Sequence, residues 1–452
     1  MVTTERRTRA TGTDMSEDND YESGSLSLWS TVAMGTGVMI GAGIFALTGQ
    51  VAELAGPLFP LAFVAAAAIS GFSAYSYIKV SSEYPSAGGI AMILKKAYGP
   101  TMVTGAAALM MALSMVINES LVARTFATYA LRPFGLQGDS LLVPGIALAV
   151  VAVSLTINLA GNEAVGRVAQ LTAVLKIGGI VLFALVGIWA SGLTFEAASG
   201  GWVEDTDLGG FLAGTALGIL AFKGFTTITN SGAEVEKPEK NVGRAIALSL
   251  LVCLAVYVLV TLAVGGALDI GQIVAAKDYA LAEAARPALG EIGVWATVAI
   301  ALIATGSGIL ASMFAVSRML AMLTKMELIP HSHFGLPGRV QHHTLVYVAV
   351  VAAALAAFMD LGRIASMGAF LYLVMDMVIH WGVLRHLRED VGARAPVVVI
   401  ALALDGIVLV ALAVLKAFSD PLILAVSAGT VVVVAIFVGV FLRSASPDTS
   451  EG

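Results

Sequence analysis

Charged residues are scarce in this sequence. Only 12% of its 452 residues are Asp, Glu, Lys or Arg, whereas 58% are hydrophobic. A typical soluble domain has about 25% charged residues, so this chain has more apolar surface than a soluble core requires. We therefore interpret it as an integral membrane protein. It contains no basic stripe of the kind that binds nucleic acid, so no nucleic-acid partner is expected.

Cysteine is also scarce. Cys253 is the only cysteine, which excludes an intrachain disulfide framework and leaves no cysteine-based metal or redox motif. No GxSxG or HExxH motif is present, and we find no intramembrane set of His and Asp residues. The sequence therefore predicts that the protein is not an enzyme and has neither a cofactor nor a metal site.

Long apolar segments, by contrast, dominate the chain. Each has about 20 residues, which matches about 30 Å of hydrocarbon at 1.5 Å per helical residue, so these segments are predicted to be helices and not barrel strands. The predicted fold is an all-α integral membrane protein with twelve transmembrane helices. The predicted segments are 28–50, 58–80, 102–131, 141–160, 168–191, 209–231, 246–268, 292–323, 343–358, 361–384, 397–416 and 421–442.

Polar tails flank the apolar segments. Residues 1–27 lack the apolar stretch of a secretory signal and are predicted to form a disordered cytoplasmic tail, as is the end of the chain, 443–452. Most Lys and Arg residues of the connections fall on one side of the predicted bundle, and positive residues resist translocation. Both termini are therefore placed in the cytoplasm of a multi-pass plasma-membrane protein.

Glycines interrupt the first apolar segment. Residues 35–49 read GTGVMIGAGIFALTG, and each glycine inside a helix costs about 1 kcal/mol relative to alanine. We expect a helix that is broken within the membrane and binds a polar ligand through its free backbone groups. The alternative is a continuous helix whose glycines allow close packing against a neighbour.

The sixth segment has a similar interruption. Glycines between Gly214 and Gly224 divide its apolar run, and Lys223 adds a charge at membrane depth. Two interrupted segments five apart point to an inverted repeat of five plus five helices, with the ligand site between the two breaks. The predicted parts are a first repeat at 28–191, a second repeat at 209–384 and two peripheral helices within 397–442.

A set of short motifs occurs in order along the first eight segments. They are GAGIF (41–45), AGP (55–57), YPSAGG (84–89), INLAGNEAVGRVAQLTAVLK (157–176), GF followed by TNSGAEVEKPEKNVGRAI (224–246), and a weaker match, VSRMLAMLTKMELIP (316–330). This set resembles the amino acid permeases of the amino acid-polyamine-organocation (APC) superfamily. The resemblance implies a LeuT-like fold and transport of an amino acid. Thr226 stands where many relatives carry Asp, and Lys223 replaces a commonly uncharged residue, so the substrate class stays open.

An amino acid zwitterion needs one site for an anion and another for a cation. Half-helix N-termini offer free N–H groups for the carboxylate, and half-helix C-termini offer carbonyls for the ammonium. By this physics and by the resemblance, the carboxylate is assigned to the N–H groups of Gly41, Ala42, Gly43 and Ile44. The ammonium is assigned to carbonyls around Ala221, Phe222 and Lys223, with Met39 or Ile40. Phe222 or Phe225 is a candidate aromatic gate, although such rings more often serve packing.

Lys176 lies too deep in the fifth segment to reach the membrane surface easily. In some relatives a lysine at this position replaces a bound sodium ion between spans one and eight. The resemblance thus implies that protonation of Lys176 couples to the substrate, with Ser312 as the predicted hydroxyl partner and Ser307 as the second choice. The alternative is a permanently charged lysine that only joins spans one, five and eight.

Glu119 is a carboxylate near the middle of the third segment and should have a partner. The candidates are Lys176, Arg124, Lys223 and a cationic group of the substrate. Arg124 is disfavoured, because residues five apart point to different faces of a helix. A structural ion pair and a substrate contact both stay open.

The predicted function is proton-coupled uptake of an amino acid by alternating access. The partners are the amino acid, the proton and the lipid bilayer, and the oligomeric state is open. The alternative is an exchanger without ion coupling. A channel or a membrane enzyme is disfavoured, because neither a filter motif nor a catalytic motif is visible.

Overall fold

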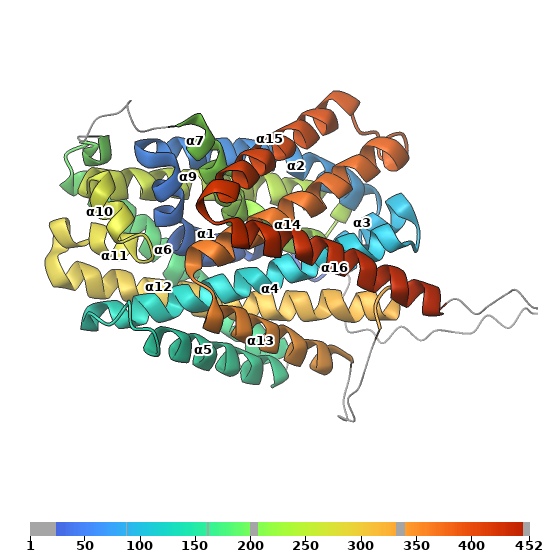
Figure 1. The fold of residues 1–452 in the computed structure, drawn as a ribbon, viewed down its shortest axis with the longest axis horizontal. Helices are drawn as coiled ribbons and strands as arrows, with labels where there is room; N and C mark the ends of the chain where they lie inside the picture. Colours follow the sequence, from blue (N-terminus) through green and yellow to red (C-terminus); the bar gives the residue numbers. More distant parts are fainter. Residues whose placement is uncertain (1–23, 87, 161, 199–206, 331–339, 446–452) are drawn as a thin grey trace, which may run out of the picture.

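The computed structural model describes residues 24–86, 88–160, 162–198, 207–330 and 340–445, and these are almost entirely helical (Figure 1). The long helices are α1 (Leu28–Ala55), α2 (Phe59–Glu83), α4 (Met102–Leu131), α5 (Leu142–Leu159), α6 (Asn162–Ala190), α7 (Leu208–Phe222), α9 (Pro238–Ala267), α12 (Arg286–Lys325), α13 (Val340–Phe358), α14 (Leu361–Gly382), α15 (Ala395–Ser419) and α16 (Pro421–Ala445). The short elements are η1 (Gly56–Leu58), α3 (Gly89–Tyr98), η2 (Arg132–Phe134), η3 (Glu196–Ala198), η4 (Lys223–Phe225), α8 (Thr226–Asn230), η5 (Gly232–Glu234), α10 (Ile270–Ala275), α11 (Ala280–Ala284) and η6 (Val383–Leu387).

The helices are long and apolar. Within the described residues, nine helical stretches have the length and composition needed to cross a membrane. Three further apolar stretches are shorter, at 28–41, 175–190 and 342–358. The prediction of an all-helical membrane protein is confirmed at this level. The count of twelve crossings and the five-plus-five repeat stay predictions.

Polar residues and glycine set several helix ends. The Ser27 hydroxyl accepts a hydrogen bond from the Ser30 N–H at 3.2 Å and so caps α1. Asp360 caps α14 in the same way, accepting from the Arg363 N–H at 2.9 Å. Gly290 has φ 58° and ψ −148°, so the regular part of α12 begins after it, close to the predicted start at 292.

Helix α1 lies in the middle of the molecule, with α5 and α13 at one edge and α15 toward the opposite edge (Figure 1). It packs against α7, α9 and α12. Leu26, just before α1, donates its N–H to the Glu234 carbonyl, and its own carbonyl accepts from the Glu236 N–H, both at 2.9 Å. The end of the predicted 1–27 tail is therefore tied to the segment after α8, while residues 1–23 lie outside the described part.

The predicted break in the first segment is wrong in this conformation, because α1 is helical without interruption from Leu28 to Ala55. Its glycines serve close packing. A Cβ on Gly41 would lie 2.8 Å from the Ala304 carbonyl oxygen of α12, and one on Gly43 would lie 2.6 Å from the Ala221 Cβ of α7. The interruption in the sixth segment is confirmed as a short 3-10 segment, η4, between α7 and α8.

We expect Gly43→Ala to destabilise the protein relative to Gly71→Ala. A Cβ on Gly71 in α2 meets no atom within 4 Å, whereas one on Gly43 meets Ala221 and the Tyr257 hydroxyl below 3 Å. Both variants gain the helix propensity of alanine, about 1 kcal/mol, so the difference isolates the overpacking cost of about 1–3 kcal/mol. Thermal unfolding of the purified protein in detergent measures it. Equal shifts in Tm would contradict the packing role of Gly43.

Candidate functional site

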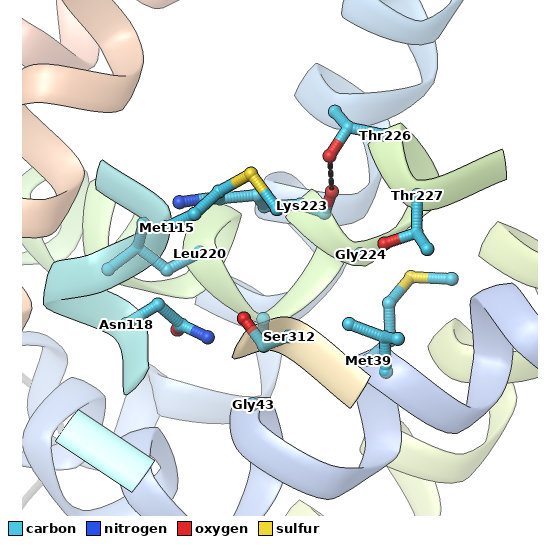
Figure 2. Close-up of a pocket in the computed structure, with 12 residues that line it drawn as sticks. Met39, Gly43, Met115, Asn118, Leu220, Lys223, Gly224, Thr226, Thr227 and Ser312 are labelled. Atoms are coloured by element: carbon cyan, nitrogen blue, oxygen red, sulfur yellow. Dashed lines mark hydrogen bonds between the residues drawn. The ribbon is translucent and has the colours of Figure 1, made fainter. Parts of the chain in front are cut away.

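A small pocket lies where α1, α4, α12 and the α7–η4–α8 segment meet (Figure 2). Its free volume is about 20 Å³, enough for one water molecule. Figure 2 shows the side chains of Asn118 and Ser312 close together near its centre. Its lining consists of Val38, Met39, Gly43, Met115, Asn118, Leu220, Ala221, Lys223, Gly224, Thr226, Thr227 and Ser312. Parts of the two glycine-rich segments, α1 and α7–η4–α8, thus meet at one pocket.

Helix α1 contributes less to the pocket than predicted. Of the predicted residues on α1, only Gly43 and Met39 line it, while Ile40 and Ile44 are fully buried in packing and Gly41 faces α12. The backbone of Ala42 is helical, and its side chain is outside the described part. Because N–H groups inside a continuous helix bond to carbonyls four residues earlier, those of 41–44 are engaged in the helix. In this conformation they offer no anion site.

The two predicted gate residues belong to the packing around the pocket. Phe222 lies against Tyr257 with ring centroids 5.0 Å apart, and Phe225 meets Tyr77 edge to face at 5.2 Å. Both phenylalanines are fully buried, and neither lines the pocket. This arrangement matches the packing alternative for these rings and not the gate.

Tyr257 on α9 is a residue that the sequence analysis missed. Its hydroxyl lies 2.7 Å from the Met39 carbonyl of α1 and 3.0 Å from the Ala221 carbonyl of α7. These are two of the carbonyls assigned to the substrate ammonium. The single hydroxyl proton of Tyr257 can be donated to either of them and therefore joins α1 to α7. A tyrosine inside the seventh apolar segment was the available signal.

Lys223 and Glu119 lie on the same side of the site. The Lys223 ammonium donates to the Ser114 hydroxyl at 2.7 Å and lies 5.5 Å from the centre of the Tyr372 ring. Among the described residues, neither carboxyl oxygen of the fully buried Glu119 makes a well-aligned hydrogen bond, although the Ser312 hydroxyl is close enough to act on this group. The Lys223 ammonium acts electrostatically on this carboxylate, but no ion pair within 4.0 Å joins the two side chains. Arg124 instead donates to the Ala356 carbonyl at 2.8 Å, so it is not the partner of Glu119.

Lys176 joins three helices, as both readings of this residue required. From α6, its ammonium donates to the Gly37 carbonyl of α1 at 2.6 Å and to the Ser307 hydroxyl of α12 at 3.3 Å. The prediction of Ser312 as its partner is wrong, and the second choice, Ser307, makes the contact. Ser312 lines the pocket instead. Lys176 is only 4% exposed, so its charge depends on these two acceptors.

Comparison with known proteins decides the family. A model of the family described as "Amino acid permease" matches residues 26–450. The chain belongs to the amino acid permease family. The resemblance inferred from the motifs is thereby confirmed, and the permease is a multi-pass membrane protein.

Several curated proteins are similar to the permease. It is 29% identical over 377 residues to the inner membrane transport protein YbaT of Escherichia coli. The matched region covers 83% of this chain and 86% of that protein. It is 28% identical over 377 residues to the branched-chain amino acid permease BcaP of Lactococcus lactis, covering 76% and 79%. It is 27% identical over 376 residues to the vacuolar cationic amino acid transporter 4 of Arabidopsis thaliana, covering 76% and 60%. These relatives are transport proteins, which agrees with the prediction of a non-enzyme at the family level.

The permease also contains a set of His and Asp residues that the sequence analysis declared absent. Asp376 and His380 on α14 and Asp405 on α15 are fully buried and lie together. The statement that no intramembrane His/Asp set exists was therefore wrong. The spacing of Asp376 and His380, one helical turn apart in an apolar segment, was the available signal.

We expect Tyr257→Phe to lower the stability of the permease by about 0.5–1.5 kcal/mol, because one buried hydrogen bond between α1 and α7 is lost. Tyr129→Phe is the matched control. Tyr129 is equally buried, and its hydroxyl makes no well-aligned hydrogen bond among the described residues, with only a weaker interaction with the Leu281 backbone, so its removal should cost less. Thermal unfolding in detergent compares the two variants. A loss in Tyr129→Phe as large as in Tyr257→Phe would contradict the bridging role.

Proposed function

We propose that the permease is a secondary active transporter that takes up an amino acid by alternating access and couples uptake to protons. The proposal includes twelve membrane crossings, the inverted repeat of a LeuT-like fold, and both termini in the cytoplasm of a plasma-membrane protein. Membership of the permease family supports the amino acid as substrate. The observation that carries the coupling is the buried ammonium of Lys176, which holds α1 to α12 beside the pocket.

The size of the pocket supports a moving site. Its free volume of about 20 Å³ holds one water molecule, so the helices around it have to separate before an amino acid enters. The uncharged polar side chains on the walls are those of Asn118, Thr226, Thr227 and Ser312, and the Thr226 hydroxyl already donates to the Lys223 carbonyl. The carbonyls of Met39 and Ala221 become available to the substrate ammonium when the Tyr257 hydroxyl leaves them.

The proposed anion site depends on the same movement. Opening of α1 at its glycines would release the N–H groups of Gly41, Ala42, Gly43 and Ile44 for the substrate carboxylate. Lys223 lies in the wall as a buried cation and disfavours a substrate with a cationic side chain. Met39, Met115 and Leu220 make much of the remaining wall apolar. An amino acid with an uncharged side chain fits this wall best.

Lys176 supplies the coupling step. Both of its hydrogen bonds are donated by the ammonium, and a neutral amine keeps fewer donors and loses the charge that attracts the Gly37 carbonyl. Loss of the proton therefore weakens the bridge between α1 and α12. Because α1 forms one wall of the pocket, the protonation of Lys176 and the position of that wall become linked.

We expect Lys176→Met to abolish the stimulation of uptake by an inward proton gradient. In proteoliposomes, we expect the gradient to raise uptake of a radiolabelled neutral amino acid by the wild type about tenfold, an effect of about 1.4 kcal/mol. The variant should bind the amino acid without this stimulation. Binding is followed by thermal stabilisation across a panel of amino acids at several pH values.

Lys325→Met is the control, because Lys325 is an exposed lysine at the end of α12. It should keep the response to the gradient. An unchanged pH response in Lys176→Met would reject Lys176 as the coupling group. A wild type that loads labelled amino acid only against internal amino acid, with or without a gradient, would be an exchanger without ion coupling.

A further inference from the structure

A buried polar cluster lies away from the pocket, between α2, α14 and α15. Its three ionisable members are Asp376, His380 and Asp405, and each is at most 1% exposed. One ligand atom from each of them lies within 4.8 Å of the other two. Ionisable groups at such depth in a membrane protein need partners that offset the cost of burial.

Hydroxyl groups of α2 hold two of the three side chains in place. Asp376 accepts hydrogen bonds from Ser73 and Tyr77, both at 2.6 Å. The Nδ1 atom of His380 lies 2.9 Å from the Ser76 hydroxyl. These contacts are typical of metal sites. A histidine that binds a metal through one ring nitrogen usually makes a hydrogen bond through the other, and carboxylates that bind a metal also accept hydrogen bonds. The Nε2 atom of His380 is thereby directed to the carboxylates.

The inner atoms of the cluster lie close together, but their hydrogen-bond geometry is poor. His380 Nε2 lies 3.2 Å from an oxygen of Asp405 and 3.6 Å from an oxygen of Asp376. These separations are those of ion pairs, but among the described residues neither His380 Nε2 nor the two oxygens of Asp405 make a well-aligned hydrogen bond. The buried carboxyl group of Asp405 therefore faces His380 Nε2 without a well-aligned hydrogen bond, at a cost that a bound ligand would remove.

We propose that Asp376, His380 and Asp405 bind a divalent transition-metal ion of the Zn²⁺ type. Imidazole and carboxylate are ligands that zinc accepts, and ligand atoms at about 2.0–2.2 Å from a tetrahedral zinc lie about 3.3–3.6 Å apart. The two measured separations are close to that range. Two carboxylates and one dication also sum to zero charge, which suits a site surrounded by apolar helices.

Such an ion would join α14 to α15. The hydroxyl groups of Ser73, Ser76 and Tyr77 would in turn join this site to α2. Two aromatic contacts connect this region to the pocket. Tyr77 packs on Phe225 of η4, and Tyr372, one turn before Asp376, lies beside Lys223. The ion is thus placed to stabilise the wall of the pocket without contacting the substrate. The proposal stands on these side chains alone and does not require proton coupling.

Metal content of the purified permease tests the proposal. The protein is produced in zinc-supplemented cells and purified through a tag that contains no histidine. It is then treated with EDTA, which removes metal ions bound at the protein surface. Because the site is fully buried, about one zinc per chain should remain by mass spectrometry of the elements. Protein produced in cobalt medium should show the visible absorption bands of tetrahedral Co²⁺. Less than about 0.1 metal ion per chain in both preparations would overturn the proposal and leave a cluster that shares protons.

Variants locate the ion. Asp405→Asn and His380→Gln should each lose most of the bound metal and unfold at a lower Tm than the wild type. The matched controls are Asp390→Asn and His386→Gln, which change exposed residues near the same end of the bundle and should retain metal. Retention of metal in Asp405→Asn would overturn the assignment. If a variant fails to fold, the metal content and Co²⁺ spectrum of the wild type still decide.

Discussion

Backbone carbonyls of α1 that accept hydrogen bonds from neighbouring helices are the interactions on which the rest of the structure depends. The Ser249 hydroxyl donates to the Val32 carbonyl. The Lys176 ammonium donates to the Gly37 carbonyl, and the Tyr257 hydroxyl donates to the Met39 carbonyl. A carbonyl has two lone pairs, so it can keep its helical bond and accept a second donor. Away from water, such bonds hold α1 against α6 and α9 without exposing any polar group to lipid. The glycines of α1 allow the neighbouring helices to come close enough for this.

The buried charges are distributed in a way that follows from the same constraint. Lys176 is satisfied by a carbonyl and a hydroxyl, and Lys223 by a hydroxyl and an aromatic face. Glu119 makes no well-aligned hydrogen bond among the described residues, although Ser312 and Lys223 both act on its carboxyl group. A buried carboxyl group without a well-aligned hydrogen bond is costly in a bundle interior, so the region between α4 and η4 retains unused hydrogen-bonding capacity. That region is also the wall of the pocket.

Sequence patterns predicted the helices well and the partners of particular residues less well. The run of glycines in α1 predicted a break, but a break and close packing both require a missing Cβ, so the count of glycines does not separate them. Ser312 was preferred to Ser307 as the partner of Lys176. Five residues turn an α-helix by about 140°, so the two hydroxyls point in different directions, and only the packing of α12 on α6 selects Ser307.

The sequence alone determined the membrane class, the helical segments and the family. It also determined that Lys176, Lys223 and Glu119 lie deep in apolar segments. Each is a property of a short stretch of residues, because about 20 apolar residues form a membrane helix wherever they occur. The tertiary structure decided the continuity of α1, the role of Tyr257 and the assembly of the cluster around His380. Ser73 and Asp376 are 303 positions apart, and Lys176 and Gly37 are 139 apart. Contacts at such separations depend on how whole helices pack, which the local pattern of residues does not specify.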